Sequence, residues 1–134
     1  MPDPVLSVDT VVKEYGDQVK TRALDGVSLT LAPGAFAALV GPSGCGKSTL
    51  LNIVGLLDRP TSGTIAVAGK QTAELDERGL TSLRAHALGF VFQFHHLLPA
   101  FTALENVMLP SWGERGMPTA KMRTDAEEML RAVG

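Results

Sequence analysis

The feature that most constrains this chain is a glycine-rich run, Gly41-Pro-Ser-Gly-Cys-Gly-Lys47-Ser48, which fits G-x-x-x-x-G-K-[ST] at every fixed position. Residues 36–40 are continuously apolar, which is typical of a strand buried on both faces. Residues 47–57 place leucine, isoleucine and valine at helical spacing. A buried strand, a glycine-rich loop and a helix in this order predict an α/β domain with an anion-binding loop.

The residue types of this loop predict its chemistry. Glycine lets the backbone curl tightly, so that successive N–H groups converge on one anion. The N-terminus of the following helix adds a partial positive charge, worth about 0.3–1 kcal/mol. Lys47 brings a full charge to the β- and γ-phosphates of a nucleotide, and Ser48 offers a hydroxyl to Mg²⁺. The residues expected to bind are Gly41, Pro42, Ser43, Gly44, Cys45, Gly46, Lys47 and Ser48.

Composition excludes several other classes of protein. Hydrophobic residues make up 45% of the 134 residues, too many for a disordered chain. A net charge of −2 argues against nucleic-acid binding through bulk positive charge. The single cysteine cannot form an internal disulfide, and no apolar run reaches the ~20 residues of a membrane span. Because the N-terminus also lacks the pattern of a signal peptide, we expect a soluble, cytoplasmic single domain.

Hydrophobic periodicity predicts further strands and helices on both sides of the loop. Strands are expected at residues 5–12, 23–31, 64–68 and 88–92, the last of them buried. Helices are expected at residues 76–87, at 102–110 and at 118–133. Thr102 and Glu105 have the spacing of a capping box, and Pro110 is expected to end that helix.

Several single residues have both a functional and an ordinary interpretation. Tyr15 is equally well explained as a ring that stacks on a purine or as a core or turn tyrosine. Gln93 follows the predicted strand 88–92, where open α/β sheets bind ligands, although a lone glutamine is usually polar surface. Cys45 is favoured as a small spacer over a reactive thiol. Asp58 is interpreted as the end of the helix rather than as a Mg²⁺ ligand.

The three histidines, His86, His95 and His96, do not favour a metal site. Adjacent residues rarely bind one ion, and no cysteine or carboxylate lies nearby at the spacing of a zinc site. The loop 95–99 is expected instead to be exposed and to touch a partner.

These motifs together resemble the ATP-binding subunit of ABC transporters. Residues 41–49 are similar to its Walker A motif, Tyr15 lies where that family has an adenine-stacking aromatic, and Gln93 lies where it has the Q-loop glutamine. Within the family, residues 88–107 are similar to the lipoprotein-releasing branch. Residues 55–63 fit that branch and its macrolide-exporter relatives. The resemblance extends from Val5 to Gly134.

The resemblance implies a fold, a set of roles and partners. The fold would be the P-loop NTPase fold of ABC ATPases, with antiparallel strands and an incomplete parallel sheet. Residues 5–92 would be part of the ATP-binding core, and residues 93–134 the Q-loop and the start of a helical subdomain. ATP would be bound with Mg²⁺ held by Ser48 and Gln93, with Thr49 at the α-phosphate and with Lys47 and Gln93 as the catalytic residues.

The same resemblance implies partners and a location. The segment Phe94–Asn106 would face the transmembrane permease subunits, and a second ATPase subunit would complete a dimer. The protein would be peripheral, on the cytoplasmic face of the bacterial inner membrane, where ATP hydrolysis would drive lipoprotein release or export.

The chain departs from the family in its missing motifs. It has no second strand ending in Asp-Glu, no Leu-Ser-Gly-Gly-Gln motif and no later switch histidine. We therefore expect an N-terminal portion of the subunit, which binds nucleotide and does not hydrolyse it alone. Two alternatives remain: a small P-loop kinase or other NTPase, and a non-catalytic nucleotide-binding fragment.

Overall fold

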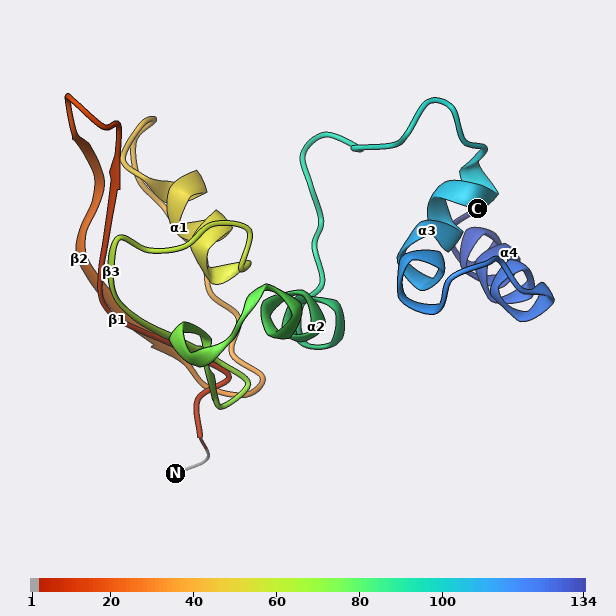
Figure 1. The fold of residues 1–134 in the computed structure, drawn as a ribbon, viewed down its shortest axis with the longest axis horizontal. Helices are drawn as coiled ribbons and strands as arrows, with labels where there is room; N and C mark the ends of the chain where they lie inside the picture. The colour runs from red at the N-terminus through yellow and green to blue at the C-terminus, as the bar shows by residue number, and fades with distance from the viewer. Residues whose placement is uncertain (1–2) are drawn as a thin grey trace. The chain divides into compact units, whose positions relative to one another are not determined.

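An antiparallel sheet of four strands, in the order β2-β1-β3-β4, forms one side of the first part of the chain (Figure 1). The computed structural model describes residues 3–134. The strands are β1 (Leu6–Tyr15), β2 (Thr21–Leu31), β3 (Ser62–Val67) and β4 (Lys70–Gln71). Each pair of neighbours is antiparallel, and β1 lies between β2 and β3. The predicted strands at 5–12, 23–31 and 64–68 are thus confirmed, with shifted ends.

Two helices pack on one face of this sheet (Figure 1). They are α1 (Lys47–Val54) and α2 (Glu77–Ala87), and a short 3-10 turn, η1 (Thr72–Glu74), joins β4 to the approach of α2. Alternate residues of the strands point at the helices because side chains alternate along a strand. The buried apolar residues of this core are Val8, Val11, Leu24, Leu50, Ile53, Leu56, Ile65, Val67, Leu80 and Leu83.

Helix α1 ends earlier than the sequence predicts, at Val54 rather than at residue 57. A Cβ on Gly55 would lie 2.7 Å from the Phe90 ring and 2.9 Å from the carbonyl oxygen of Leu51, so the chain is tightly packed here. The next residue, Leu56, has a φ of 57°, a left-handed conformation that terminates the helix. Leu56 is nevertheless buried, and its place in the core offsets the strain of that conformation.

Two predicted strands, at residues 36–40 and 88–92, are wrong. Neither segment is a strand in the described part of the chain, and both carry exposed apolar side chains. Phe36 and Val91 are essentially fully exposed, at 99% and 103%. A continuous apolar run indicates burial, but a strand also requires a hydrogen-bonded neighbour, and the sheet contains neither segment. The predicted parallel strands are therefore not formed, and the sheet of this α/β fold is antiparallel.

The chain divides into two compact units, Met1–Phe90 and Val91–Gly134. The second unit is a helical hairpin of α3 (Ala103–Arg115) and α4 (Ala120–Val133). Its buried residues are Met108, Met122 and Ala126. Within the described residues, no helix of either unit has the length and apolar character that crossing a membrane requires.

Helix α3 continues through Pro110, where the sequence predicts its end. Proline inside a helix removes one hydrogen bond and costs about 3 kcal/mol. Packing on both sides of the proline compensates: Met108 is buried against α4, and the Trp112 ring meets Phe101 edge-on with centroids 6.3 Å apart. The capping box of Thr102 and Glu105 is confirmed at the start of the helix.

Candidate functional site

The glycine loop, residues 41–49, leads directly into α1 and forms its N-terminus. The residue before the helix, Gly46, has a φ of 92°, which favours glycine, and no side chain caps the first turn. The first turn of α1 also contains no acidic residue. Because capping side chains and carboxylates would compete for the first N–H groups of the helix, this N-terminus has the properties of an anion-binding site.

Strand β2 holds the glycine loop closely at Gly46. A Cβ at this position would lie 2.5 Å from the carbonyl oxygen of Ala23 and 3.0 Å from Cδ2 of Leu24. Only glycine permits so close an approach of two backbone segments. The sheet therefore fixes where the loop begins its turn into α1.

Lys47 lies at the start of α1, with its ammonium folded back over the loop. Its Nζ donates to the carbonyl oxygens of Gly41 and Pro42, each at 2.7 Å, and lies 3.7 Å from Sγ of Cys45. These three partners include no carboxylate, so the positive charge is held by dipoles and is available to an anion. Ser48 beside it is exposed, and Thr49 is half-buried. The structure thus places the predicted residues 41–49 in one continuous segment, the turn at residues 41–46 and the start of α1.

Tyr15 lies at the end of β1, in the same unit as the glycine loop. Its hydroxyl donates to Oδ2 of Asp58 at 3.0 Å, and the Nζ of Lys13 lies 4.9 Å from the ring centroid. The residue keeps 43% of its surface exposed. Tyr15 is therefore not a core tyrosine. Its stacking role stays a prediction.

The sequence predicts that Asp58 ends a helix, but the structure places it in contact with Lys13 and Tyr15. Helix α1 has already ended at Val54, and Asp58 instead accepts hydrogen bonds from Lys13, Tyr15 and the N–H of Arg59. Burial raises the pKa of this carboxyl, but these hydrogen bonds and the Lys13 charge outweigh burial and leave the pKa below its ordinary value. No local pattern predicts the contacts, because Lys13 and Tyr15 lie 45 and 43 residues away in the sequence.

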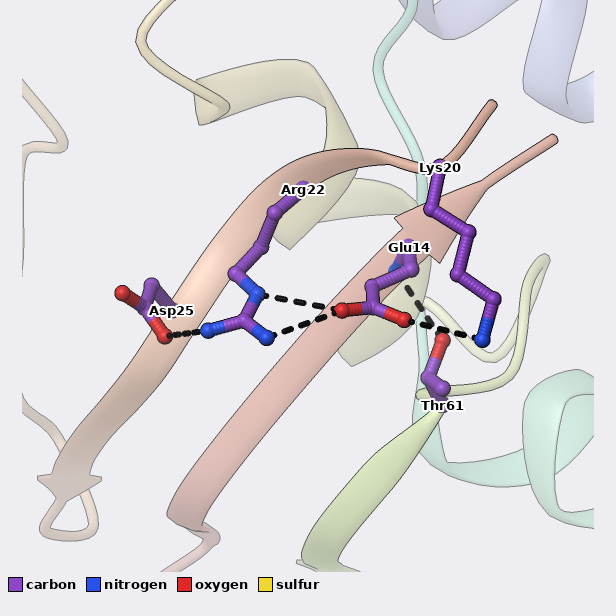
Figure 2. Close-up of polar contacts among 5 residues, drawn as sticks. All are labelled: Glu14, Lys20, Arg22, Asp25 and Thr61. Carbon is purple, nitrogen blue, oxygen red and sulfur yellow. Dashed lines mark hydrogen bonds and ion pairs between the residues drawn. The ribbon is translucent and has the colours of Figure 1, made fainter. Parts of the chain in front are cut away.

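A second polar cluster braces the β1–β2 hairpin next to Tyr15, as Figure 2 shows. Glu14 Oε1 accepts from Nε and Nη2 of Arg22, at 3.1 and 3.0 Å, and Oε2 lies 3.5 Å from Nζ of Lys20. The N–H of Glu14 donates to Oγ1 of Thr61 at 2.9 Å. The hydrogen bond from Arg22 holds the pKa of Glu14 below its ordinary value. These contacts link both sides of β1, and thereby fix the backbone that carries Tyr15.

Gln93 belongs to the second unit, where it is exposed at a bend. The apolar residues that follow it, Phe94, Leu97 and Leu98, are exposed as well. Asn106 shapes this loop: its Oδ1 accepts from the N–H of Leu98 at 2.9 Å, and its Nδ2 donates to the carbonyl oxygens of Leu98, Phe101 and Thr102. Sequence reasoning gave Asn106 no such role. The part of Gln93 in binding remains a prediction.

The histidines have local contacts in the described structure. The ring of His86 is hydrogen-bonded to the carbonyl oxygen of Ser82 at 2.8 Å, and Nδ1 of His95 accepts from the N–H of Leu97. His96 meets the Phe92 ring edge-on. Among the side chains that the structure describes, no three of His, Cys, Asp or Glu gather as metal ligands would.

A family model described as ABC transporter matches residues 24–134, and the chain belongs to that family. The predicted resemblance is thereby confirmed, and the alternative of a small P-loop kinase is not supported.

The curated relatives make the assignment more specific. The chain is 54% identical to Lipoprotein-releasing system ATP-binding protein LolD 1 of Rhodopseudomonas palustris, over 97% of this chain and 58% of that protein. It is 54% identical to LolD of Anaeromyxobacter dehalogenans, over 98% of this chain and 55% of that protein. It is also similar, at 46% identity, to the Pyoverdine export ATP-binding/permease protein PvdT of Pseudomonas entomophila. The chain spans somewhat more than half the length of these LolD relatives.

Two solved structures share the fold. The ATP-binding cassette MJ0796 in a dimeric post-hydrolysis state, bound to ADP and Pi, matches with a TM-score of 0.83 and 41% identity, over 94% of this chain and 56% of that one. A second dimeric structure of MJ0796, described as a bacterial ABC transporter cassette, matches equally well. The predicted ABC ATPase fold is confirmed by these neighbours.

Proposed function

We propose that the chain binds ATP with Mg²⁺ through the glycine loop, as the ATP-binding part of a transporter that releases or exports lipoproteins. The observation that carries this proposal is the N-terminus of α1, where no side-chain cap and no acid competes for the first N–H groups while Lys47 holds its charge over the loop. The similarity to LolD proteins supports lipoproteins as the cargo.

The residues of the loop fit the nucleotide in chemical terms. Lys47 neutralises the β- and γ-phosphates, and the backbone N–H groups of the loop surround them. Ser48, an exposed residue at the first turn of α1, holds Mg²⁺. Thr49 contacts the α-phosphate, and the Tyr15 ring stacks on the base. When bound, Mg²⁺ neutralises developing charge on the phosphates.

The second unit is the proposed contact to membrane partners. Residues 94–106 present exposed phenylalanine and leucine side chains in a loop that Asn106 holds in shape. An apolar patch of this kind is typical of a protein interface. We place the permease subunits of the transporter here, at the cytoplasmic face of the inner membrane. A second ATPase subunit is supported by the dimeric state of the MJ0796 structures.

For this chain by itself, the proposed activity is nucleotide binding without turnover. The sequence has no Leu-Ser-Gly-Gly-Gln motif and no strand that ends in Asp-Glu. In the full family, ATP hydrolysis would be coupled to release or export of the lipoprotein.

The test is a titration of the chain with a fluorescent ATP analogue, with and without Mg²⁺. We expect Mg²⁺-dependent binding and its loss in Lys47→Ala, because that variant lacks the only charge in the loop. Lys121→Ala serves as the matched control, since Lys121 is an exposed lysine of α4 paired with Asp125. Undiminished binding by Lys47→Ala would contradict the proposed site.

A further inference from the structure

Tyr15 is partly exposed, yet its hydroxyl is hydrogen-bonded to Asp58 and its ring lies against Lys13, which is itself paired with Asp58. We infer that Asp58, together with Lys13, orients the Tyr15 ring for stacking on the nucleotide base, and so sets how strongly the base contributes to affinity. The inference rests on the proposed function, because it concerns the same nucleotide. Asp58 and Lys13 are positioning residues, since they act through the tyrosine ring.

Both carboxylate oxygens of Asp58 are used in this arrangement. Oδ1 accepts from Nζ of Lys13 at 2.7 Å, and Oδ2 accepts from the hydroxyl of Tyr15 at 3.0 Å. Lys13 is fixed in turn, because its Nζ also donates to the carbonyl oxygen of Arg59 at 2.7 Å and its side chain is only 12% exposed. Asp58 thus ties the far end of the tyrosine ring to a lysine that does not move freely.

The ammonium group of Lys13 lies over one face of the Tyr15 ring. The ammonium lies 4.9 Å from the ring centroid, within the distance of a cation–π contact. The residue still exposes 43% of its surface, which leaves area for contact with a planar ligand. Because two side-chain torsions decide where the ring points, an anchored hydroxyl and one covered face fix its orientation before any ligand binds.

The tyrosine lies close to the phosphate site along the sheet. Strand β2 contacts the glycine loop where the carbonyl of Ala23 approaches Gly46, and the next residue, Leu24, is the β1 partner of Lys13. Tyr15 follows Lys13 by two residues, roughly 7 Å along the strand. Strands β1 and β2 therefore connect the glycine loop, the proposed phosphate site, to the Tyr15 ring, the proposed base site.

Substitution of Asp58 by Asn disturbs this arrangement with little change in volume. A carboxylate accepts from two donors, whereas an amide group offers one acceptor oxygen and one donor NH₂. In Asp58→Asn the amide oxygen still accepts from Lys13, while the NH₂ group donates to the Tyr15 hydroxyl, so both contacts lose the extra strength that the negative charge of the carboxylate gives them. The ring is then held less firmly, and ordering it becomes an added cost of stacking.

The experiment compares two ligands by calorimetry on the whole 134-residue chain, Mg–ATP and Mg–tripolyphosphate, which has no base. We expect Asp58→Asn to lower affinity for ATP by roughly three- to tenfold, the scale of a weakened base–aromatic stack, with tripolyphosphate affinity changed less than about twofold. Asp9→Asn is the matched control, because it removes the same charge from an exposed position of β1 that contacts Thr10. If Asp58 only stabilised the fold, Asp58→Asn would lower the affinities for both ligands by the same factor, and that result would overturn the inference.

Further variants keep the inference testable if Asp58→Asn is poorly folded. Tyr15→Phe removes only the hydroxyl, and we expect it to lower the affinity for ATP but not the affinity for tripolyphosphate. In Tyr15→Ala, which has no ring to orient, adding Asp58→Asn should cause no further loss of ATP affinity. Additive losses, or no effect of Tyr15→Phe on ATP, overturn the inference. A failure of Lys47→Ala to weaken tripolyphosphate counts instead against the proposed phosphate site.

Discussion

At the level of single residues, Gly46 is the position where backbone conformation and packing together restrict the glycine loop. Its φ is 92°, and an added Cβ would lie 2.5 Å from a backbone oxygen, which cannot rotate away as a side chain can. We expect Gly46→Ala to lose about 1–3 kcal/mol of unfolding free energy and at least roughly tenfold in ATP affinity. Urea unfolding and calorimetric titration measure the two effects.

Gly69→Ala provides the control for Gly46→Ala. Gly69 has a similar φ of 75°, but nothing lies within 4 Å of an added Cβ. This variant should show the conformational cost alone, with ATP affinity retained; equal binding losses in both variants would mean that the loop has no special requirement at Gly46.

The loop itself could be predicted from sequence because its spacing is local. The ties of Asp58 to Lys13 and Tyr15 could not, because they join residues more than 40 positions apart.

At the level of elements, the start of α3 shows a local signal that the structure confirms. Oγ1 of Thr102 accepts from the N–H of Glu105 at 3.3 Å, and Oε2 of Glu105 accepts from the N–H of Thr102 at 2.7 Å. The hydrogen bonds from Thr102 also hold the pKa of Glu105 below its ordinary value. We expect Thr102→Ala to destabilise the helical hairpin by about 1 kcal/mol, measured by circular dichroism during urea unfolding.

Thr124→Ala is the control for that cap. Thr124 is an exposed threonine inside α4 whose hydroxyl donates to the carbonyl oxygen of Ala120. Its loss should change stability by less than about 0.5 kcal/mol. If the two alanine variants were equally stable, the capping box would not contribute to the stability of the hairpin.

The cap could be predicted from the sequence, whereas the strand predicted at residues 36–40 is wrong, and the reason is physical. A cap depends on residues three positions apart, but a strand depends on a partner strand whose place in the chain no local pattern gives.

At the level of the whole molecule, apolar side chains remain exposed on segments that the sequence places in a buried sheet. Phe36, Val40 and Val91 are at least 84% exposed, and none of them lies in a strand of the described structure. Extended apolar segments with unpaired backbone groups are templates for pairing with another chain. Since the hydrophobic contribution follows the apolar area removed from water, association of two such surfaces is favourable.

We therefore expect the isolated chain to self-associate, with an apparent mass by light scattering that rises with protein concentration. The double variant Phe36→Ser/Val91→Ser should reduce this rise, because it removes two fully exposed apolar side chains from segments that lie outside the sheet. Val133→Ser is the control, since Val133 is 85% exposed but lies in a helix rather than in an extended segment. A monomeric mass at every concentration would show that exposed apolar segments do not drive association here. An equal reduction by Val133→Ser would show that any exposed valine suffices, and that the extended segments 36–40 and 88–92 contribute nothing specific.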